Sequence, residues 1–292
     1  MTAFTPPNSF IPGFKKHKVM KSFDMKRFAR TFCWTFQTEL TGILSGTCGI
    51  TFGFLVCVIA QLWPVLKSGG DITIVEKSGV ISSCYIAYLV YLVIGGTYIM
   101  GSMKTSKSLL AFKMLPATDA EKFIVRFIFA TAVWAVMGLV ALCVSDVLRM
   151  LMCVLAGVGN AGSFIPDVLL SLFRSGGRPF GAILAYGEVN WSGTLLFYAT
   201  LVWAHSAYML GRILLRRHPF VLISCVMLLL WVLLFIAGIC FDEAFDRVSM
   251  TAWMTAQWCF MAAALLLAVL NWWLSYRMFR RLQVINDKWI NL

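Results

Sequence analysis

Six stretches of the chain are long and apolar enough to cross a membrane as helices. The hydrocarbon core of a bilayer, about 30 Å thick, needs about 20 mostly apolar residues in helical form. None of the six stretches carries an acidic residue, and Arg126 at one end of the third is their only fixed cation. The sequence therefore predicts an all-α, polytopic membrane domain over 41–275, with spans at Thr41–Trp63, Val80–Gly101, Ile124–Val144, Ser192–Gly211, Pro219–Cys240 and Thr251–Ser275.

A helix with one apolar side is predicted just before the first span. Its bulky and small apolar residues recur at helical spacing, and its basic residues fall on the opposite side. Such a helix lies in the membrane interface, held by its apolar face and by anionic headgroups. The alternative is a soluble helix packed on a partner. Residues 1–40 are thus predicted to be a cytoplasmic arm and an interfacial elbow helix, with the apolar side formed by Met25, Phe28, Ala29, Phe32, Cys33 and Phe36 and the basic side by Lys26, Arg27 and Arg30.

Composition agrees with a chain that exposes apolar surface to lipid. Hydrophobic residues make up 60% of the 292 residues and charged residues only 13%, against about 45–50% and about 25% in soluble domains. A soluble chain of this length needs a polar surface that these residues do not supply. The expected surroundings of the apolar surface are therefore the lipid bilayer.

The distribution of lysine and arginine orients the predicted spans. With both termini inside, the four inner segments carry seven, five, three and four of these residues, and the outer segments carry the other six of 25. An excess of lysine and arginine marks the cytoplasmic side. Both termini, including the tail 276–292, are therefore predicted to be cytoplasmic. The net charge of +12 is mostly this asymmetry and does not indicate a nucleic-acid partner.

The segment 145–191, predicted to lie outside, contains apolar runs that are too short to span the membrane. Val147–Val158 has only 12 residues, and the run at Ile165–Phe173 is shorter still, where a span needs about 20. We expect re-entrant or interfacial helices here. The alternatives are that Val147–Val158 extends the third span outward past Asp146 and Arg149, or that the segment adds a pair of spans.

Residues that carry enzyme or relay chemistry are scarce in the predicted spans. Proton and ion relays in membranes need ionisable groups within the spans, and only His205 qualifies, although a hydrogen-bonded packing residue is the commoner explanation. The nine cysteines are scattered without a C-x-x-C motif or a histidine at ligand spacing, so no metal site is predicted. No catalytic residue is predicted, and the chain is not expected to be an enzyme.

A nucleotide site is not predicted either. The stretch GSMKTSKS (101–108) approaches the spacing of a phosphate-binding loop, but Ser106 replaces the glycine that must precede the lysine. The stretch also leaves a membrane helix instead of a strand. We therefore expect no cofactor in this chain.

A short polar segment, 102–123, separates the second and third spans on the predicted cytoplasmic side. Ser108–Met114 is predicted to be a short helix that ends before Pro116, because the residue before a proline disfavours the helical conformation. Thr118 and Glu121 then fit the capping box of a new helix that continues into the third span. The short helix carries four bulky apolar side chains, at Leu109, Leu110, Phe112 and Met114.

Two interpretations of this segment remain open from the residues alone. Exposed apolar side chains are a liability on a free surface, which favours docking of a partner whose push passes directly into the third span. The alternative is an ordinary basic loop whose apolar residues dip into lipid.

The stretch GGTYIMGSMKTSKSLLAFKMLPATDAEKFIVRF (95–127) resembles type-2 permeases of ATP-binding-cassette exporters from bacteria of the Bacteroides type. The resemblance implies an elbow helix before six spans, cytoplasmic termini, and a coupling helix between spans two and three that docks on a separately encoded ATPase. The long segment between spans three and four departs from this family, whose re-entrant helices lie between the last two spans. The residues that carry the resemblance are Leu115, Pro116, Ala117, Thr118, Glu121, Lys122, Phe123 and Arg126.

The function implied by this resemblance is that of a permease subunit in the bacterial inner membrane. It would work as a homodimer or a paired permease, with ATP and magnesium held by the cytosolic ATPase partner. The alternative is a non-transporting membrane scaffold or sensor that docks a cytosolic regulator. The residues expected to dock on the partner or to transmit its motion are Leu109, Phe112, Met114, Leu115, Pro116, Thr118, Glu121, Lys122 and Arg126.

Polar-tipped and small residues on the second span are candidates for the lining of a translocation path. They are Tyr88, Tyr91, Gly95 and Tyr98, together with His205 on the fourth span. Anchoring at the membrane interface and ordinary packing explain the tyrosines equally well.

Overall fold

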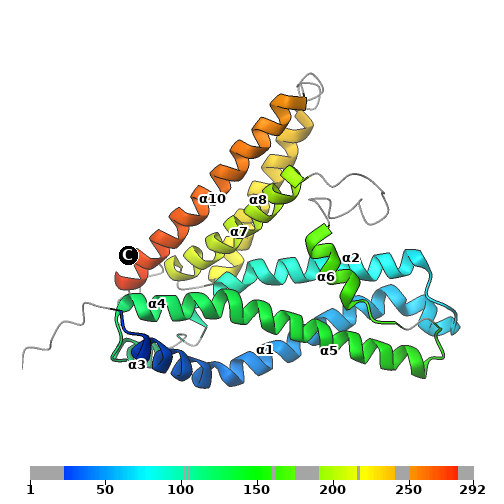
Figure 1. The fold of residues 1–292 in the computed structure, drawn as a ribbon, viewed down its shortest axis with the longest axis horizontal. Helices are drawn as coiled ribbons and strands as arrows, with labels where there is room; N and C mark the ends of the chain where they lie inside the picture. The colour runs from blue at the N-terminus through cyan, green and yellow to red at the C-terminus, as the bar shows by residue number, and fades with distance from the viewer. Residues whose placement is uncertain are drawn as a thin grey trace, which may run out of the picture.

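The computed structural model describes residues 23–101, 103, 106–159, 162–174, 191–215, 218–240 and 250–281. Every element that it assigns within these ranges is a helix (Figure 1). The helices are α1 (Met25–Ser68), α2 (Ile74–Ile94), η1 (Gly95–Met100), α3 (Ser106–Lys113), α4 (Asp119–Ile128), η2 (Phe129–Val133), α5 (Trp134–Leu155), α6 (Ile165–Arg174), α7 (Trp191–Leu214), α8 (Pro219–Cys240) and α10 (Met250–Arg281).

Four helical stretches within the described residues are long and apolar enough to cross a membrane. They are Met25–Ser68, Ile74–Met100, Asp119–Leu155 and Met254–Arg281, and they contain the first and third predicted spans and most of the second and sixth. The all-α class is confirmed for the described residues, and the length and composition of these four stretches support the predicted membrane character. α7 and α8 occupy the places of the fourth and fifth predicted spans, and the count of six remains a prediction.

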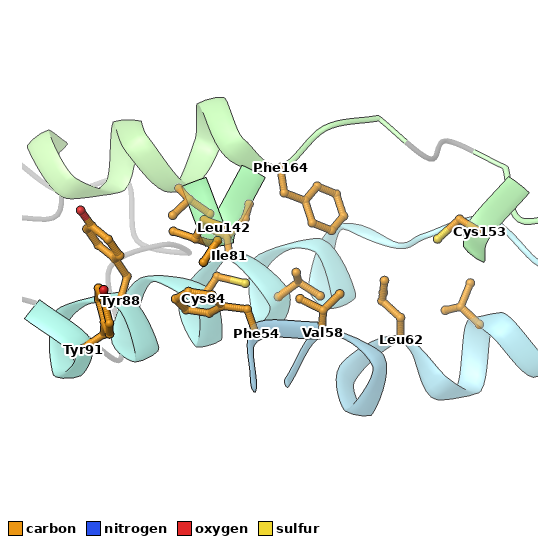
Figure 2. Packing of buried hydrophobic residues seen from close by; sticks show 14 of the residues in the cluster. Phe54, Val58, Leu62, Ile81, Cys84, Tyr88, Tyr91, Leu142, Cys153 and Phe164 are labelled. Atoms are coloured by element: carbon orange, nitrogen blue, oxygen red, sulfur yellow. The ribbon is translucent and has the colours of Figure 1, made fainter. Parts of the chain in front are cut away.

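The helices form two groups that diverge from one end of the molecule (Figure 1). In the first group α1, α2 and the α4–α5 stretch lie side by side around an apolar core that includes Phe54, Leu62, Ile81 and Leu142 (Figure 2). The second group consists of α7, α8 and α10. The groups meet where α3 lies, around a second core shared by residues of η1, α3, α4, α7 and α10.

α7 and α10 run in the same direction and pack closely along their length. The Ser192 hydroxyl donates to the Gln257 side-chain oxygen at 2.5 Å, and the Asn271 amide donates to the Ser206 hydroxyl at 3.0 Å. Hydrogen bonds of this kind between apolar helices fix their register, because polar groups have few other partners within lipid.

The residues of the predicted elbow helix from Met25 onward are helical and form the first part of α1, and their place in the membrane interface stays a prediction. α1 continues without a break for 44 residues, about 66 Å at 1.5 Å per residue, which is about twice the thickness of a bilayer core. No glycine or proline lies between Met25 and Thr41 to end the helix there. α1 ends at Gly69, which adopts the left-handed conformation (φ 67°) typical of a C-terminal cap.

Val147–Leu155 is the continuation of α5 and not a separate helix, as in the alternative in which this run extends the third span outward; its place relative to the membrane stays a prediction. α5 runs through Asp146 and Arg149 to Leu155 because these two side chains neutralise each other one turn apart, at 2.8 Å. Asp146 also accepts from the Ser163 hydroxyl at 2.7 Å, so the buried carboxylate keeps its partners. α6 has ten residues, too few to span, and residues 175–190 lie outside the described part.

Candidate functional site

The turn between α3 and α4 has the capping box that the sequence predicted. Thr118 accepts from the Glu121 backbone N–H at 3.3 Å, and one Glu121 oxygen accepts from the Thr118 backbone N–H at 2.8 Å. α3 ends at Lys113, and Pro116 follows in the turn. α4 therefore begins at a fixed point, Asp119, and continues through η2 into α5.

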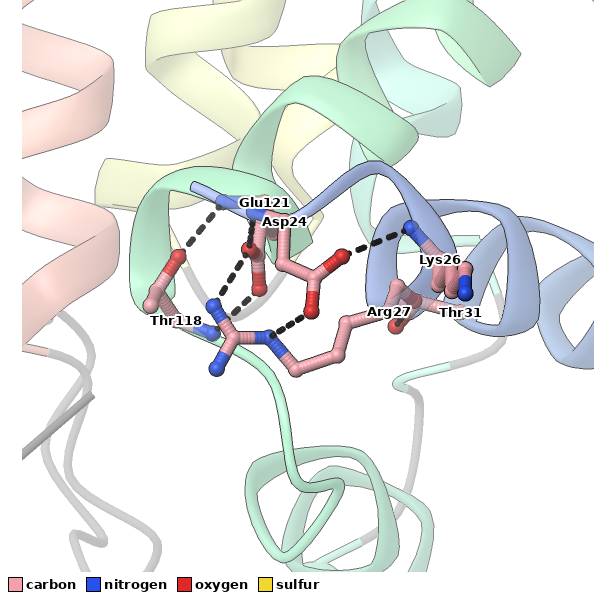
Figure 3. Close-up of polar contacts among 6 residues, drawn as sticks. All are labelled: Asp24, Lys26, Arg27, Thr31, Thr118 and Glu121. Atoms are coloured by element: carbon pink, nitrogen blue, oxygen red, sulfur yellow. Dashed lines mark hydrogen bonds and ion pairs between the residues drawn. The ribbon is translucent and has the colours of Figure 1, made fainter. Parts of the chain in front are cut away.

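The second oxygen of Glu121 binds the beginning of α1 (Figure 3). It accepts from the Asp24 backbone N–H at 2.8 Å and from the Arg27 guanidinium at 3.1 Å. Asp24 itself caps α1 by accepting from the Lys26 backbone N–H at 2.9 Å. Because the Glu121 side chain is fully buried, these bonds join the first turns of α1 and α4 into one unit, which we call the α1–α4 junction (Asp24, Arg27, Thr118 and Glu121).

α3 is attached to the same unit by residues of α4. The Lys122 ammonium donates to the Lys113 backbone carbonyl at 2.8 Å, which satisfies a group at the end of α3. The Arg126 guanidinium lies 4.8 Å from the centre of the Phe112 ring, within the range of a cation–π contact. A displacement of α3 would therefore carry α4 with it.

The four apolar side chains that were predicted on α3 differ in their exposure. Leu109 and Phe112 are buried in the chain's own core and are not exposed as expected. Leu110 and Met114 are 48% and 76% exposed. Leu115 is half-buried, and Ala111 and Pro116 are exposed, so the outward apolar surface of this segment consists of Leu110, Ala111, Met114 and Pro116.

No partner for Arg126 is predicted from the sequence, and the structure pairs it with Glu39 of α1. The two side chains are 1% and 4% exposed, and the Tyr98 hydroxyl donates to the other Glu39 oxygen at 3.4 Å. Glu39 was not predicted as a site residue because it lies just outside the predicted first span, Thr41–Trp63. A usable signal exists: polar residues recur every fourth position along this side of α1, at Arg27, Thr31, Thr35 and Glu39.

The candidate path tyrosines are packed between α2 and the α4–α5 stretch. The Tyr88 and Tyr91 hydroxyls donate to the backbone carbonyls of Ala135 and Trp134 at 3.2 and 2.9 Å. The Tyr98 ring lies 4.7 Å from the Trp134 ring. These contacts account for the three tyrosines as packing residues, and their role in a path stays a prediction.

Gly95 and His205 also sit at close helix contacts. A Cβ atom on Gly95 would lie 2.3 Å from the Trp134 ring, so only glycine fits there. The His205 Nδ1 atom lies 2.9 Å from the Leu92 carbonyl oxygen, a hydrogen bond between α7 and α2. This bond is compatible with a packing role for His205, and a path role for both residues stays a prediction.

No group of three or more histidine, cysteine, aspartate or glutamate side chains with metal-binding geometry occurs among the described residues. Comparison with protein-family models, with curated proteins and with solved structures finds no match for this chain.

Removing the helix cap tests the joint between α3 and α4. Thr118→Ala should lower the free energy of unfolding by about 1 kcal/mol, the usual value of a side-chain cap. Thr118→Ser keeps the hydroxyl and should change the free energy of unfolding by no more than about 0.3 kcal/mol. The measurement is denaturant unfolding of the purified variants in micelles, and equal losses in the two variants would contradict the capping role.

Proposed function

We propose that the chain is the membrane permease subunit of an ATP-driven exporter, moved by a separate cytosolic ATPase. One observation carries the proposal: α3 lies between the second and third long helices, presents an outward apolar surface, and is attached to the first turn of α4. A partner that pressed on Leu110 and Met114 would push directly on a helix long enough to cross the membrane.

The α1–α4 junction extends this mechanical link to a second long helix. Glu121 holds the first turn of α1, so α1, α3 and α4 would move together when a partner displaces α3. In this proposal ATP binding closes the partner ATPases, and the movement of α3 tilts the α4–α5 stretch to open a path between two permease subunits. ATP and magnesium belong to the partner, and this chain does no covalent chemistry.

The exposed side chains of α3 give the direct test. Leu110→Ala with Met114→Ala should reduce the amount of ATPase that co-purifies with the chain from native membranes at least tenfold, since apolar anchors at an interface contribute about 2 kcal/mol or more each. Leu170→Ala is the matched control, because Leu170 is also 48% exposed but lies on α6. The readout is the co-purifying chain that cross-links to labelled ATP.

The outcome also separates the two candidate functions. If no ATP-binding chain accompanies the protein, the permease proposal is wrong. A nucleotide-free regulator lost on the same double substitution would instead favour the scaffold or sensor.

The orientation predicted from the basic residues has its own test. Lys113, at the end of α3, is predicted to face the cytoplasm, so a cysteine introduced there should react only with a reagent that enters the cell. The opposite control is the loop 242–247, predicted to be outside, which lies beyond the described residues. Labelling at position 113 by an impermeant reagent added outside would overturn the orientation and the proposed docking side.

A further inference from the structure

Two neighbouring helices depart from α geometry at the same level. η1 is a six-residue 3₁₀ segment that continues α2, and η2 is a five-residue π segment between α4 and α5. The two segments contact each other. 3₁₀ runs longer than three or four residues are uncommon, and π segments are rare and concentrated at functional places.

Trp134, the first residue of α5 after η2, packs on Tyr91 near the end of α2 and on Tyr98 of η1. Its indole N–H donates to the Tyr91 carbonyl at 2.9 Å, and the Tyr91 hydroxyl donates back to the Trp134 carbonyl at 2.9 Å. Their rings stack with centroids 4.6 Å apart. The Trp134 and Tyr91 side chains thus donate hydrogen bonds to backbone carbonyls next to the 3₁₀ and π segments. Within a membrane, backbone groups that lose their regular α-helical hydrogen bonds need such replacement partners. The contact holds the helices together without continuous α geometry in either one.

A small cavity lies beside the same contact. It has a volume of about 10 Å³, at the lower limit for holding one water molecule. Val133 and Trp134 line it from η2 and α5, and Tyr98 lines it from η1. A void at this point gives the neighbouring side chains room to shift.

α1, the third helix of this group, contains two glycines close to the same cavity. Ile43, Thr47 and Ile50 of α1 line the cavity, and Gly46 and Gly49 lie between them. A Cβ atom on either glycine would meet no described atom within 4 Å, so close packing within the described chain does not explain them. Glycine inside a helix lowers its stability by about 0.5–1 kcal/mol relative to alanine.

We propose that η1, η2 and the contact of Trp134 with Tyr91 form a hinge. The unit attached to α3, which includes the α1–α4 junction and the pair of Glu39 with Arg126, turns at this hinge relative to the core around Leu62 and Leu142. The segments absorb the motion by changing between 3₁₀, π and α hydrogen bonding. The hinge is a property of this chain alone, so its test does not depend on the proposed ATPase.

Hydrogen exchange of the purified full-length chain in lipid nanodiscs tests the hinge. Amides of 95–100 and 129–133 should exchange about tenfold faster than those of 139–145 in regular α5, because hinge opening breaks their bonds locally. Val133→Ile adds one methylene at the cavity and should slow exchange in both segments together. Val136→Ile is the matched control, since Val136 is 56% exposed on the outside of α5.

The decisive signature is the effect of a change in η2 on the amides of η1. Slower exchange in 95–100 on Val133→Ile, with no change on Val136→Ile, supports the hinge. Equal protection of all three segments in the unmodified chain overturns it, and so does an effect of Val133→Ile confined to η2. Either result leaves the ATPase co-purification unaffected, so the two proposals fail separately.

Discussion

Substitution of Arg126 by methionine is expected to lower the free energy of unfolding by about 3–5 kcal/mol, because it leaves a buried carboxylate without its cation. The Glu39 side chain is only 4% exposed and has little water to replace the guanidinium. Methionine keeps much of the length of the arginine stem, so the lost charge and hydrogen bonds dominate the effect. The measurement is unfolding of the purified protein in mixed micelles over a range of denaturing detergent.

Two controls isolate the ion pair. Arg277→Met removes an exposed arginine near the end of α10 and should change stability by no more than about 0.5 kcal/mol. Glu39→Gln combined with Arg126→Met removes both charges and should recover most of the loss, since neutral replacements of a buried pair are often tolerated. A double variant as unstable as the sum of the two single variants would show that the side chains are not coupled.

Much of the helical layout is predictable from the sequence because its signals are local. The range Pro219–Cys240 is continuously apolar and begins with a proline, and α8 has these same bounds. The start of α4 follows from the spacing of Thr118 and Glu121 after Pro116. In each case residues within one or two turns decide where the helix begins or ends.

The contacts that build the candidate site depend on residues far apart in the chain. Glu39 and Arg126 are 87 positions apart, and Asp24 and Glu121 are 97 apart. Helical spacing shows that Glu39 lies on a polar side of α1 but not which helix covers that side. The burial of Phe112 likewise depends on packing between the two helix groups. The pattern of residues within an eight-residue helix does not predict that packing.

The continuation of α5 past Val144 differs from these contacts, because its signal in the sequence is local. Asp146 and Arg149 are three positions apart, a spacing at which opposite charges meet on a helix. In α5 the two side chains neutralise each other at 2.8 Å. A charged pair at this spacing is therefore compatible with a continuous apolar helix.

Phe112→Ala is expected to destabilise the protein itself, by about 3–5 kcal/mol, as for other large buried aromatic residues. The ring is 1% exposed and lies 6.2 Å, between ring centroids, from both Trp34 of α1 and Phe279 of α10. It therefore packs between the two helix groups at the end where they meet. Removing it leaves a cavity there and takes away the ring beneath the Arg126 guanidinium.

Leu110→Ala on the same helix separates this structural role from docking. Leu110 is 48% exposed, so its truncation should change the free energy of unfolding by no more than about 0.5 kcal/mol while weakening association with the proposed ATPase partner. Unfolding titrations and ATPase co-purification are measured on both variants. A stable Phe112→Ala variant that had lost the partner would mean that the Phe112 ring faces the ATPase and that the core packing described for α3 is wrong. If Phe112→Ala is destabilised, while Leu110→Ala is stable but no longer co-purifies with an ATPase, the docking surface is on the outward side of α3.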